Sequence, residues 1–272
     1  MIDNHTLVIP TRNRPALLRQ LVKYLFGRAG PMHLLVLDSS APGVAVENAT
    51  AMSAHGELVR HVVFQEEEQP VAKFARGLAL VRTPYASFCA DDDVVFPAAL
   101  RDAVAFLEVR PDYACAHGPY LNFRRDGRQI RLMREYAGPS IEAGHPGARV
   151  FRLLQNYESL FYAVFRTSDL RDILVSSLAI PALAYQEMFQ SVAALIKGKV
   201  RRLPVLYAAR QSIAPADAWR EKWQTFHWFA ENPTEVLEHY RAYRAEVCKF
   251  YEAHAPAPRL NADKFSRVLD LS

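Results

Sequence analysis

The sequence contains few cysteines and lacks the short motifs that identify several common enzyme chemistries. Its 272 residues include Cys89, Cys115 and Cys248, an odd number with no CxxC pair and no zinc-ligand spacing. We therefore expect reduced thiols and a cytoplasmic protein. The sequence has no GxGxxG, GxxxxGK[ST], HExxH or GxSxG, so nothing in it signals dinucleotide binding, a P-loop, a zinc protease or a serine hydrolase.

Long hydrophobic runs and an excess of charge are also missing. The longest uncharged run, 173–186, is interrupted by Pro181 and is too short to cross a bilayer. The first residues lack a basic segment followed by an apolar core, so we expect no signal peptide. A net charge of +4 suits phosphate-bearing ligands or an anionic membrane surface, but it falls short of what a nucleic-acid partner requires.

Short apolar runs alternate with helical patterns over the first hundred or so residues. The predicted strands are 5–10, 33–40, 57–65 and 85–90, and the predicted helices are 14–30, 71–83 and 97–113. In helix 14–30, for example, Leu18, Leu21 and Leu25 follow helical spacing. This alternation predicts an α/β fold with a mixed, mostly parallel sheet flanked by helices.

The rhythm changes after Tyr113. Residues 118–140 resemble a hairpin, 142–157 a loop that leads into a helix, and 187–210 a helix that stops at Gly198 before a short strand. From about residue 216 the chain is aromatic and charged, which predicts two regions, a domain over 1–215 and an α-helical C-terminal extension over 216–272. The extension has an aromatic cluster, which comprises Trp219, Trp223, Phe226, Trp228 and Phe229. Packing on the parent domain is the favoured interpretation of this cluster, and peripheral membrane contact by the C-terminal helices is the alternative.

Three polar segments follow predicted strands, where ligands bind in open α/β sheets. They are "PTRNR" after the first strand, "DSS" after the second and "DDD" after the fourth. Asp38 could accept hydrogen bonds from a nucleobase or ribose. Arg12, Arg14 and Lys73 could contact phosphates. The aspartates could hold Mg²⁺ or Mn²⁺ bridging a diphosphate, because these hard ions prefer oxygen ligands. Together the segments predict a nucleotide-diphosphate site.

Other interpretations of the same residues remain open. The three aspartates could be a solvated turn, or the strand-end motif of a haloacid-dehalogenase-like phosphatase, which would need a second acidic pair downstream. Asp38 could cap the following helix, and Arg12 and Arg14 could be ordinary solvated charges.

Four segments, "TLVIPTRNRPALLRQLVKYL", "LLVLDSS", "AKFARGLALVRTPYASFCADDDVVFP" and "YQEMFQSVAALIKGKVRRLPVLYAAR", follow one another in a familiar order. Over residues 5–212 the chain resembles family-two glycosyltransferases with the GT-A fold. The resemblance implies transfer of a sugar from a nucleotide-sugar donor, a UDP-sugar being favoured, with inversion at the anomeric carbon. It also implies a divalent cation (Mn²⁺ or Mg²⁺), a glycan, lipid-linked or protein acceptor with a hydroxyl, and a role in surface polysaccharide or glycoconjugate biosynthesis.

The resemblance also implies roles for single residues. Pro10, Thr11, Arg12 and Asp38 would line the nucleoside pocket. Asp91, Asp92 and Asp93 would form the DxD-like motif, with Asp93 and Asp91 as metal ligands. Glu187 would be the catalytic base, opening a helix whose dipole keeps it ionised, with His145 as the second candidate.

The sequence departs from the family pattern at three points. Ala90 replaces the first acidic residue of the aspartate motif, and the acidic pair of the late helix has become Gln186-Glu187. Phe74 and Ala75 replace an Arg-Asn pair, which leaves Lys73 and Arg76 as substitute cations. These departures keep a second interpretation open, a non-catalytic subunit that binds a nucleotide sugar.

Overall fold

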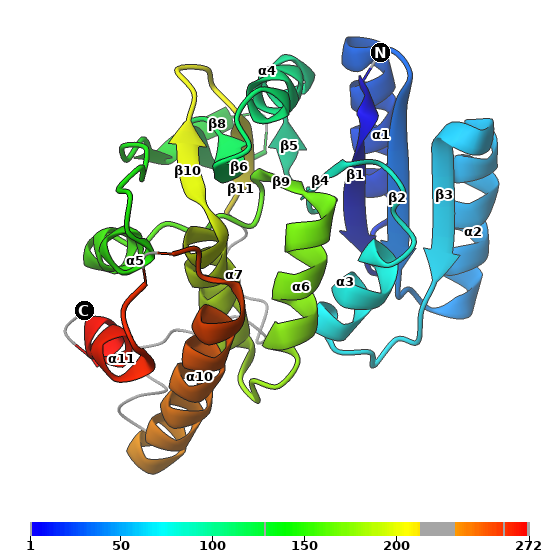
Figure 1. The fold of residues 1–272 in the computed structure, drawn as a ribbon. Helices are drawn as coiled ribbons and strands as arrows, with labels where there is room; N and C mark the ends of the chain where they lie inside the picture. The colour runs from blue at the N-terminus through cyan, green and yellow to red at the C-terminus, as the bar shows by residue number, and fades with distance from the viewer. Residues whose placement is uncertain (1, 128, 213–231, 258, 271–272) are drawn as a thin grey trace.

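A seven-stranded sheet forms the centre of the molecule (Figure 1). The computed structural model describes residues 2–127, 129–212, 232–257 and 259–270. The strand order is β10-β6-β9-β4-β1-β2-β3. Their bounds are β1 (Ile2–Thr11), β2 (Met32–Asp38), β3 (Val59–Val63), β4 (Tyr85–Phe88), β6 (Tyr113–His117), β9 (Val164–Arg166) and β10 (Lys199–Arg202). Within this sheet β9 pairs antiparallel to β4 and β6, and the other pairs are parallel, so the predicted mostly parallel α/β fold is confirmed.

Helices cover both faces of this sheet because successive strand residues point to opposite sides. On one side, Leu7 and Ile9 pack with α1 (Pro15–Ala29), α2 (Pro42–Ser53) and α4 (Pro97–Glu108). On the other side, Val8 packs with α3 (Pro70–Leu78), α6 (Thr167–Ser177) and α7 (Leu183–Lys197). The short η1 (Gly56–Leu58) precedes β3.

A smaller four-stranded sheet lies beside the first. Its order is β5-β11-β7-β8, with β5 (Val94–Val95), β7 (Tyr120–Asp126), β8 (Gln129–Tyr136) and β11 (Ala208–Gln211). The β7–β8 pair is antiparallel, which confirms the hairpin expected within 118–140. Because β5 directly follows the aspartates and pairs with β11, this sheet brings residues 208–211 to the aspartate run.

The C-terminal helices α10 (Pro233–His254) and α11 (Ala262–Asp270) lie against α7 and α5 (Pro146–Gln155) (Figure 1). Phe250 packs edge-on against Phe189 of α7, and Tyr251 stacks on Phe265 with 3.7 Å between ring centroids. The C-terminal helices therefore share the main hydrophobic core. The aromatic cluster 219–229 and the 215/216 boundary fall outside the described residues, so the two-region division stays a prediction. Among the described helices, none combines the length and apolarity needed to cross a membrane.

Among the differences from expectation, the start of α7 and the elements between 157 and 183 have a physical reason. Helix α7 begins at Leu183, directly after the buried Ala182, four residues earlier than the expected start at 187. Between 157 and 183, the three-residue β9 and helix α6 had no sequence signal of their own, because the apolar run 173–186 hid the end of one helix and the start of the next.

Candidate functional site

Two loops at the carboxyl edge of the large sheet are fastened to each other. The loop after β1 and the loop after β2 are joined by Ser39 N donating to Thr11 O (3.1 Å) and by Asn13 N donating to Ser40 Oγ (2.7 Å). Asn13 Oδ1 in turn accepts from Ala41 N (2.9 Å). Asn13 has a φ of 54°, a left-handed conformation that asparagine tolerates better than most residues. The "PTRNR" and "DSS" segments thus form one rigid unit.

Asp91 and Asp92 connect the aspartate run to this pair of loops. Thr11 Oγ1 donates to Asp91 Oδ2 at 2.6 Å. Arg14 Nη1 lies 3.3 Å from Asp91 Oδ1 and 2.9 Å from Asp92 Oδ2, so one guanidinium bridges both carboxylates. Burial raises the pKa of Asp91, while the Thr11 hydrogen bond and the Arg14 charge oppose this rise. The solvated-turn interpretation is therefore wrong for Asp91, which is 5% exposed.

Asp93 points into the protein toward the smaller sheet. Its Oδ1 accepts from Gln211 N (2.6 Å), and its Oδ2 accepts from the Tyr162 hydroxyl. Arg210 Nε lies 3.7 Å from Oδ2, and its guanidinium covers the Tyr162 ring at 4.9 Å from the centroid. Burial raises the pKa of Asp93 to about 6, against the lowering effects of the Tyr162 hydrogen bond and the Arg210 charge.

Asp38 at the end of β2 is fully buried and held by its own chain. Its carboxylate accepts from Ser40 N (2.8 Å), Asn48 Nδ2 (2.8 Å) and His61 Nε2 (2.9 Å). Burial alone would raise the pKa of Asp38, but these hydrogen bonds lower it to about 2. Asp38 is not the N-cap of α2, which begins after Ala41 without a side-chain cap. Both oxygens of this carboxylate already serve to fix the loop, and its contact with a nucleoside stays a prediction.

The basic residues differ in how they reach the site. Lys73 of α3 is buried and donates to Ser39 Oγ at 2.8 Å. Burial lowers the pKa of Lys73 to about 8, and the nearby charges of Asp38 and Asp91 limit the drop. Arg12 is exposed and close enough to lower the Lys73 pKa further. Pro10, the residue before Thr11, is partly exposed at the same edge.

Glu187 lies on the exposed side of α7, on its second turn. Since the helix begins at Leu183, the expected placement of Glu187 at the helix start is wrong, and the dipole effect fades beyond the first turn. Burial raises the pKa of Tyr157, and the charge of Glu187 raises it further while that of Arg210 lowers it. The charges of Glu187 and Arg210 thus act on the same tyrosine, whose hydroxyl lies 3.5 Å from Ser191 Oγ of α7.

His145, the second candidate base, has a structural role. It is the N-cap of α5, where its Nδ1 accepts from Gly147 N at 3.0 Å. Nδ1 of His145 thus contributes to the start of α5, which supports a structural role for this histidine.

The family model for glycosyl transferase family 2 matches residues 6–174, more than half of the chain. The chain belongs to glycosyl transferase family 2. Its aspartate run and both strand-end loops lie within the matched range, so the phosphatase interpretation is no longer needed. A search of curated proteins found no significant match.

Solved structures of similar fold include glycosyltransferases. S. aureus TarS matches with a TM-score of 0.60 and 12% identity over 98% of this chain, and the chain spans 42% of the TarS chain. A TarS 1–349 structure with UDP-GlcNAc matches with a TM-score of 0.62 and 13% identity, over 98% of this chain and 70% of that one. The structure of GalNAc-T7 with UDP, GalNAc and Mn²⁺ matches with a TM-score of 0.57 and 10% identity, over 78% of this chain and 44% of the GalNAc-T7 chain. At these identities the likeness establishes the GT-A fold alone.

The family 2 site contains two residues that sequence reasoning missed. Tyr162 and Arg210 both contact Asp93, yet they lie 69 and more than 110 positions away along the chain. The only sequence signal was the segment "YAAR" at the end of the matching pattern, because no periodicity reports which strand will pair with β5. Conversely, the structure brings Thr11, Arg14, Asp91 and Asp92 together, whereas Asp38 and Lys73 form a second, more deeply buried group.

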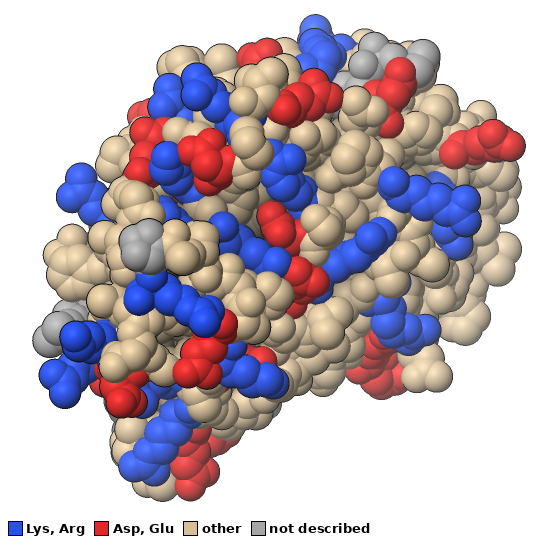
Figure 2. Space-filling model, viewed as in Figure 1, with Lys and Arg blue, Asp and Glu red and all other residues tan. Residues whose placement is uncertain are grey.

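The carboxylates of the aspartate run supply the hard oxygen donors that Mg²⁺ and Mn²⁺ prefer. Within the described part of the chain, no group of three His, Cys, Asp or Glu is arranged as a complete metal site. Such an ion often uses only one or two carboxylates together with substrate phosphates, so the donor set is compatible with it. Charges of both signs are interspersed over the visible face, so local pairs dominate there over a broad single-sign field (Figure 2).

Proposed function

We propose that this family 2 member is an inverting glycosyltransferase that moves a sugar from a nucleotide-sugar donor to a hydroxyl of an acceptor. The observation that carries the proposal is the group of Thr11, Arg14, Asp91 and Asp92 at the carboxyl edge of the sheet. It combines a guanidinium with carboxylates where open α/β sheets bind ligands. We favour a UDP-sugar, since TarS and GalNAc-T7 structures of similar fold contain UDP.

We further propose that a divalent cation binds the aspartate run and neutralises charge on the departing diphosphate. Asp93 and Asp91 are the expected ligands. The arrangement around them supports adding Asp92, because Arg14 bridges its Oδ2 to the carboxylate of Asp91. Arg12, Arg14 and Lys73 would place positive charge near the phosphates, while Pro10, Thr11 and Asp38 would shape the nucleoside side.

Glu187 is the proposed base. As the acceptor hydroxyl attacks the face opposite the nucleotide, a carboxylate within about 3 Å would take its proton, an effect worth roughly 10²–10⁴-fold. Its exposure on α7, and the effect of both Glu187 and Arg210 on the pKa of Tyr157, support this role. A place in surface polysaccharide or glycoconjugate biosynthesis, near the inner face of a membrane, completes the proposal.

A thermal-shift screen tests the donor and metal assignments. UDP, GDP, dTDP and CMP with their sugar conjugates would each be tested with EDTA or Mn²⁺. A ligand at a hundred times its Kd should add about 2.7 kcal/mol of stability. We expect UDP compounds to stabilise the protein only with Mn²⁺, and Asp93→Ala to abolish this shift.

The exposed Asp102 of α4 provides the matched control, because Asp102→Ala should leave the UDP shift unchanged. An equal shift with EDTA and in Asp93→Ala would remove the metal role. UDP binding without hydrolysis or transfer of any UDP-sugar would favour the non-catalytic subunit instead.

A further inference from the structure

A cavity of about 260 Å³ opens at the same edge of the sheet, four strands away from β2. It lies where β6 ends at His117 and β10 ends at Arg202, and these two residues are paired in register. Since β6 and β10 run in the same direction as β4 and β1, their carboxyl ends share the edge that carries the aspartates. The cavity is smaller than the 300–1,000 Å³ typical of drug-sized ligands, so it suits a single ring.

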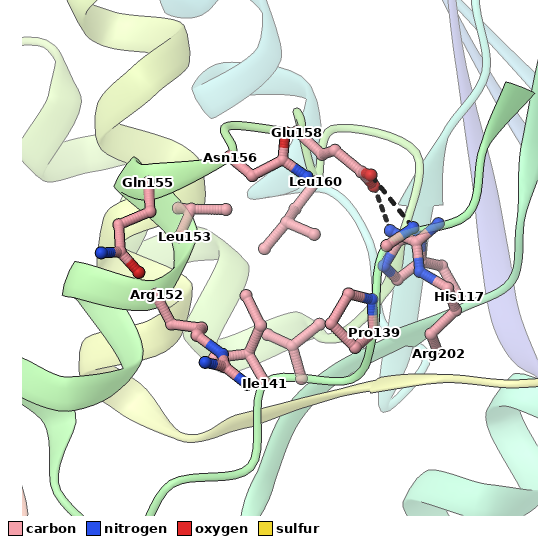
Figure 3. A pocket seen from close by; sticks show the side chains of 12 residues that line it. His117, Pro139, Ile141, Arg152, Leu153, Gln155, Asn156, Glu158, Leu160 and Arg202 are labelled. Atoms are coloured by element: carbon pink, nitrogen blue, oxygen red, sulfur yellow. Dashed lines mark hydrogen bonds and ion pairs between the residues drawn. The ribbon is translucent and has the colours of Figure 1, made fainter. Parts of the chain in front are cut away.

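The walls of this cavity differ in polarity (Figure 3). Leu153, Leu160 and Ile141 point toward its centre, and the first two are nearly fully buried. Arg152 and Gln155 of α5 lie on one side, and the Glu158–Arg202 ion pair lies on the opposite side. A ligand that fits must offer an apolar face to the floor and hydrogen-bonding groups around its perimeter.

An ion pair and hydrogen bonds to the backbone hold the polar wall of the cavity in place. Glu158 forms an ion pair with Arg202 and also accepts from Gly138 N at 3.1 Å, an approach that a side chain at Gly138 would block. Arg202 Nη1 donates to Tyr136 O at 2.7 Å, and the two charged side chains are 11% and 9% exposed. Within the described residues Arg202 Nε is buried without a hydrogen-bond partner. Because the two charges of the ion pair cancel, the wall carries little net charge, which disfavours binding of a polyphosphate. Arg202 Nε is a hydrogen-bond donor that a ligand could satisfy.

One tyrosine connects this wall to the aspartate group. Tyr120 pairs with Tyr136 of β8 on one side, and their rings stack at 4.5 Å between centroids. On its other side Tyr120 pairs with Ala208 of β11, the strand that carries Arg210. Since Tyr136 O accepts from Arg202, Tyr120 lies between the cavity wall and the strand of Arg210. Burial raises the pKa of Tyr120 to about 12, with Arg210 opposing the rise and Glu158 adding to it.

We propose that this cavity is an acceptor subsite that holds one pyranose ring, so that the acceptor is a glycan or glycoside. A pyranose presents C–H groups on its faces and hydroxyls around its perimeter, which matches an apolar floor with polar walls. The bound ring would be a unit of the acceptor remote from the reacting hydroxyl. This inference rests on the proposed transferase function.

Saturation-transfer-difference NMR tests it with methyl glycosides of glucose, galactose and N-acetylglucosamine as probes. Cyclohexanol is the comparison ligand, and inorganic phosphate, which has no carbon-bound protons to observe, is added as a competitor of the glycosides. Gln155→Trp should block the cavity mouth at little cost to folding, because Gln155 is exposed. Val175→Trp, at a 61% exposed position on α6, is the matched control. We expect signal from at least one glycoside, reduced at least fivefold by Gln155→Trp and unchanged by Val175→Trp.

Three results would overturn the proposal: no signal from any glycoside, equal glycoside signals in wild type and Gln155→Trp, or occupation of the cavity by a comparison compound. The last would be seen as a cyclohexanol signal without any glycoside signal, or as loss of the glycoside signal when phosphate is added. The UDP thermal shift, measured on the same samples, separates this proposal from the transferase function. A nucleotide shift without glycoside binding refutes the subsite alone. Glycoside binding without a shift by any nucleotide or nucleotide sugar refutes the transferase function, and the cavity then remains a sugar-binding site without an acceptor role.

Discussion

Asp93 should make the ligand-free protein less stable, although we assign it a functional role. Its carboxylate is 6% exposed, and its pKa is about 6 in the folded protein against an ordinary value of 3.8. The difference of about 2 pKa units lowers the free energy of unfolding by about 3 kcal/mol at a pH where Asp93 is ionised in both the folded and the unfolded protein. Asn at this position retains an acceptor for Gln211 N and can donate to the Tyr162 hydroxyl, but it loses the attraction of Arg210.

We therefore expect Asp93→Asn to stabilise the ligand-free protein by about 1–2 kcal/mol at pH 7.5, a rise in Tm of roughly 2–6 °C. Because the folded pKa of Asp93 is raised, its cost is complete above pH 6 and disappears as the pH falls below about 4. Between pH 7.5 and pH 5 the cost of ionised Asp93 should fall by about 1.4 kcal/mol, so the gain from the substitution should be close to zero at pH 5.

Urea denaturation of both proteins at pH 7.5 and pH 5, without nucleotide or metal, measures this effect. Asp102→Asn, at an exposed position, should change stability by less than about 0.5 kcal/mol at either pH. A less stable Asp93→Asn at pH 7.5, or a gain of equal size at the two pH values, would refute the reasoning.

Three further predictions concern other residues. Glu187→Gln should keep the UDP thermal shift and lower sugar transfer at least about 10²-fold, and near-wild-type turnover would place the base elsewhere. Asp38→Asn should cost about 2 kcal/mol in urea unfolding at pH 7. Although burial opposes them, hydrogen bonds lower the pKa of Asp38 to about 2 in the folded protein, so this cost should disappear as the pH falls through about 2. An equal cost at pH 2 and pH 7 would contradict this prediction. In Gly118→Ala, the new Cβ would lie 2.0 Å from Val205 O, so we expect a loss of at least about 1 kcal/mol by thermal unfolding, whereas Gly43→Ala, with nothing within 4 Å, should cost less.

Sequence patterns predicted those elements that are determined by residues close together in the chain. Leu18, Leu21 and Leu25 fixed the expectation of α1, which begins at Pro15 as a helix with proline at its first position should. The aspartates were found because three like charges after a buried strand need a partner. The expected partner was a divalent cation, whereas in the structure Arg14 forms ion pairs with Asp91 and Asp92, a pairing that was not predicted from the sequence.

The remainder depended on contacts between distant segments. Asp93 faces Tyr162 and Gln211 because β11 pairs with β5, a pairing of two residues on each strand that no periodicity encodes. The start of α7 was misjudged because Leu183 and Ala184 belong equally well to an apolar loop or to a first helical turn. The cavity beside Arg202 arises where α5 meets the end of β10, segments about 50 residues apart.

The β7–β8 hairpin has a consequence for how the protein behaves in concentrated solution. In the described sheet β8 lies at the end, so one side of its backbone lacks a strand partner, while Ile130 and Leu132 are 71% and 65% exposed. Such an edge invites another molecule to add a strand. Arg131 and Arg134 interrupt its apolar pattern, and two copies brought edge to edge would bring these cations together. Replacing Arg131 and Arg134 with threonine should therefore make the protein more prone to aggregate through the β8 edge.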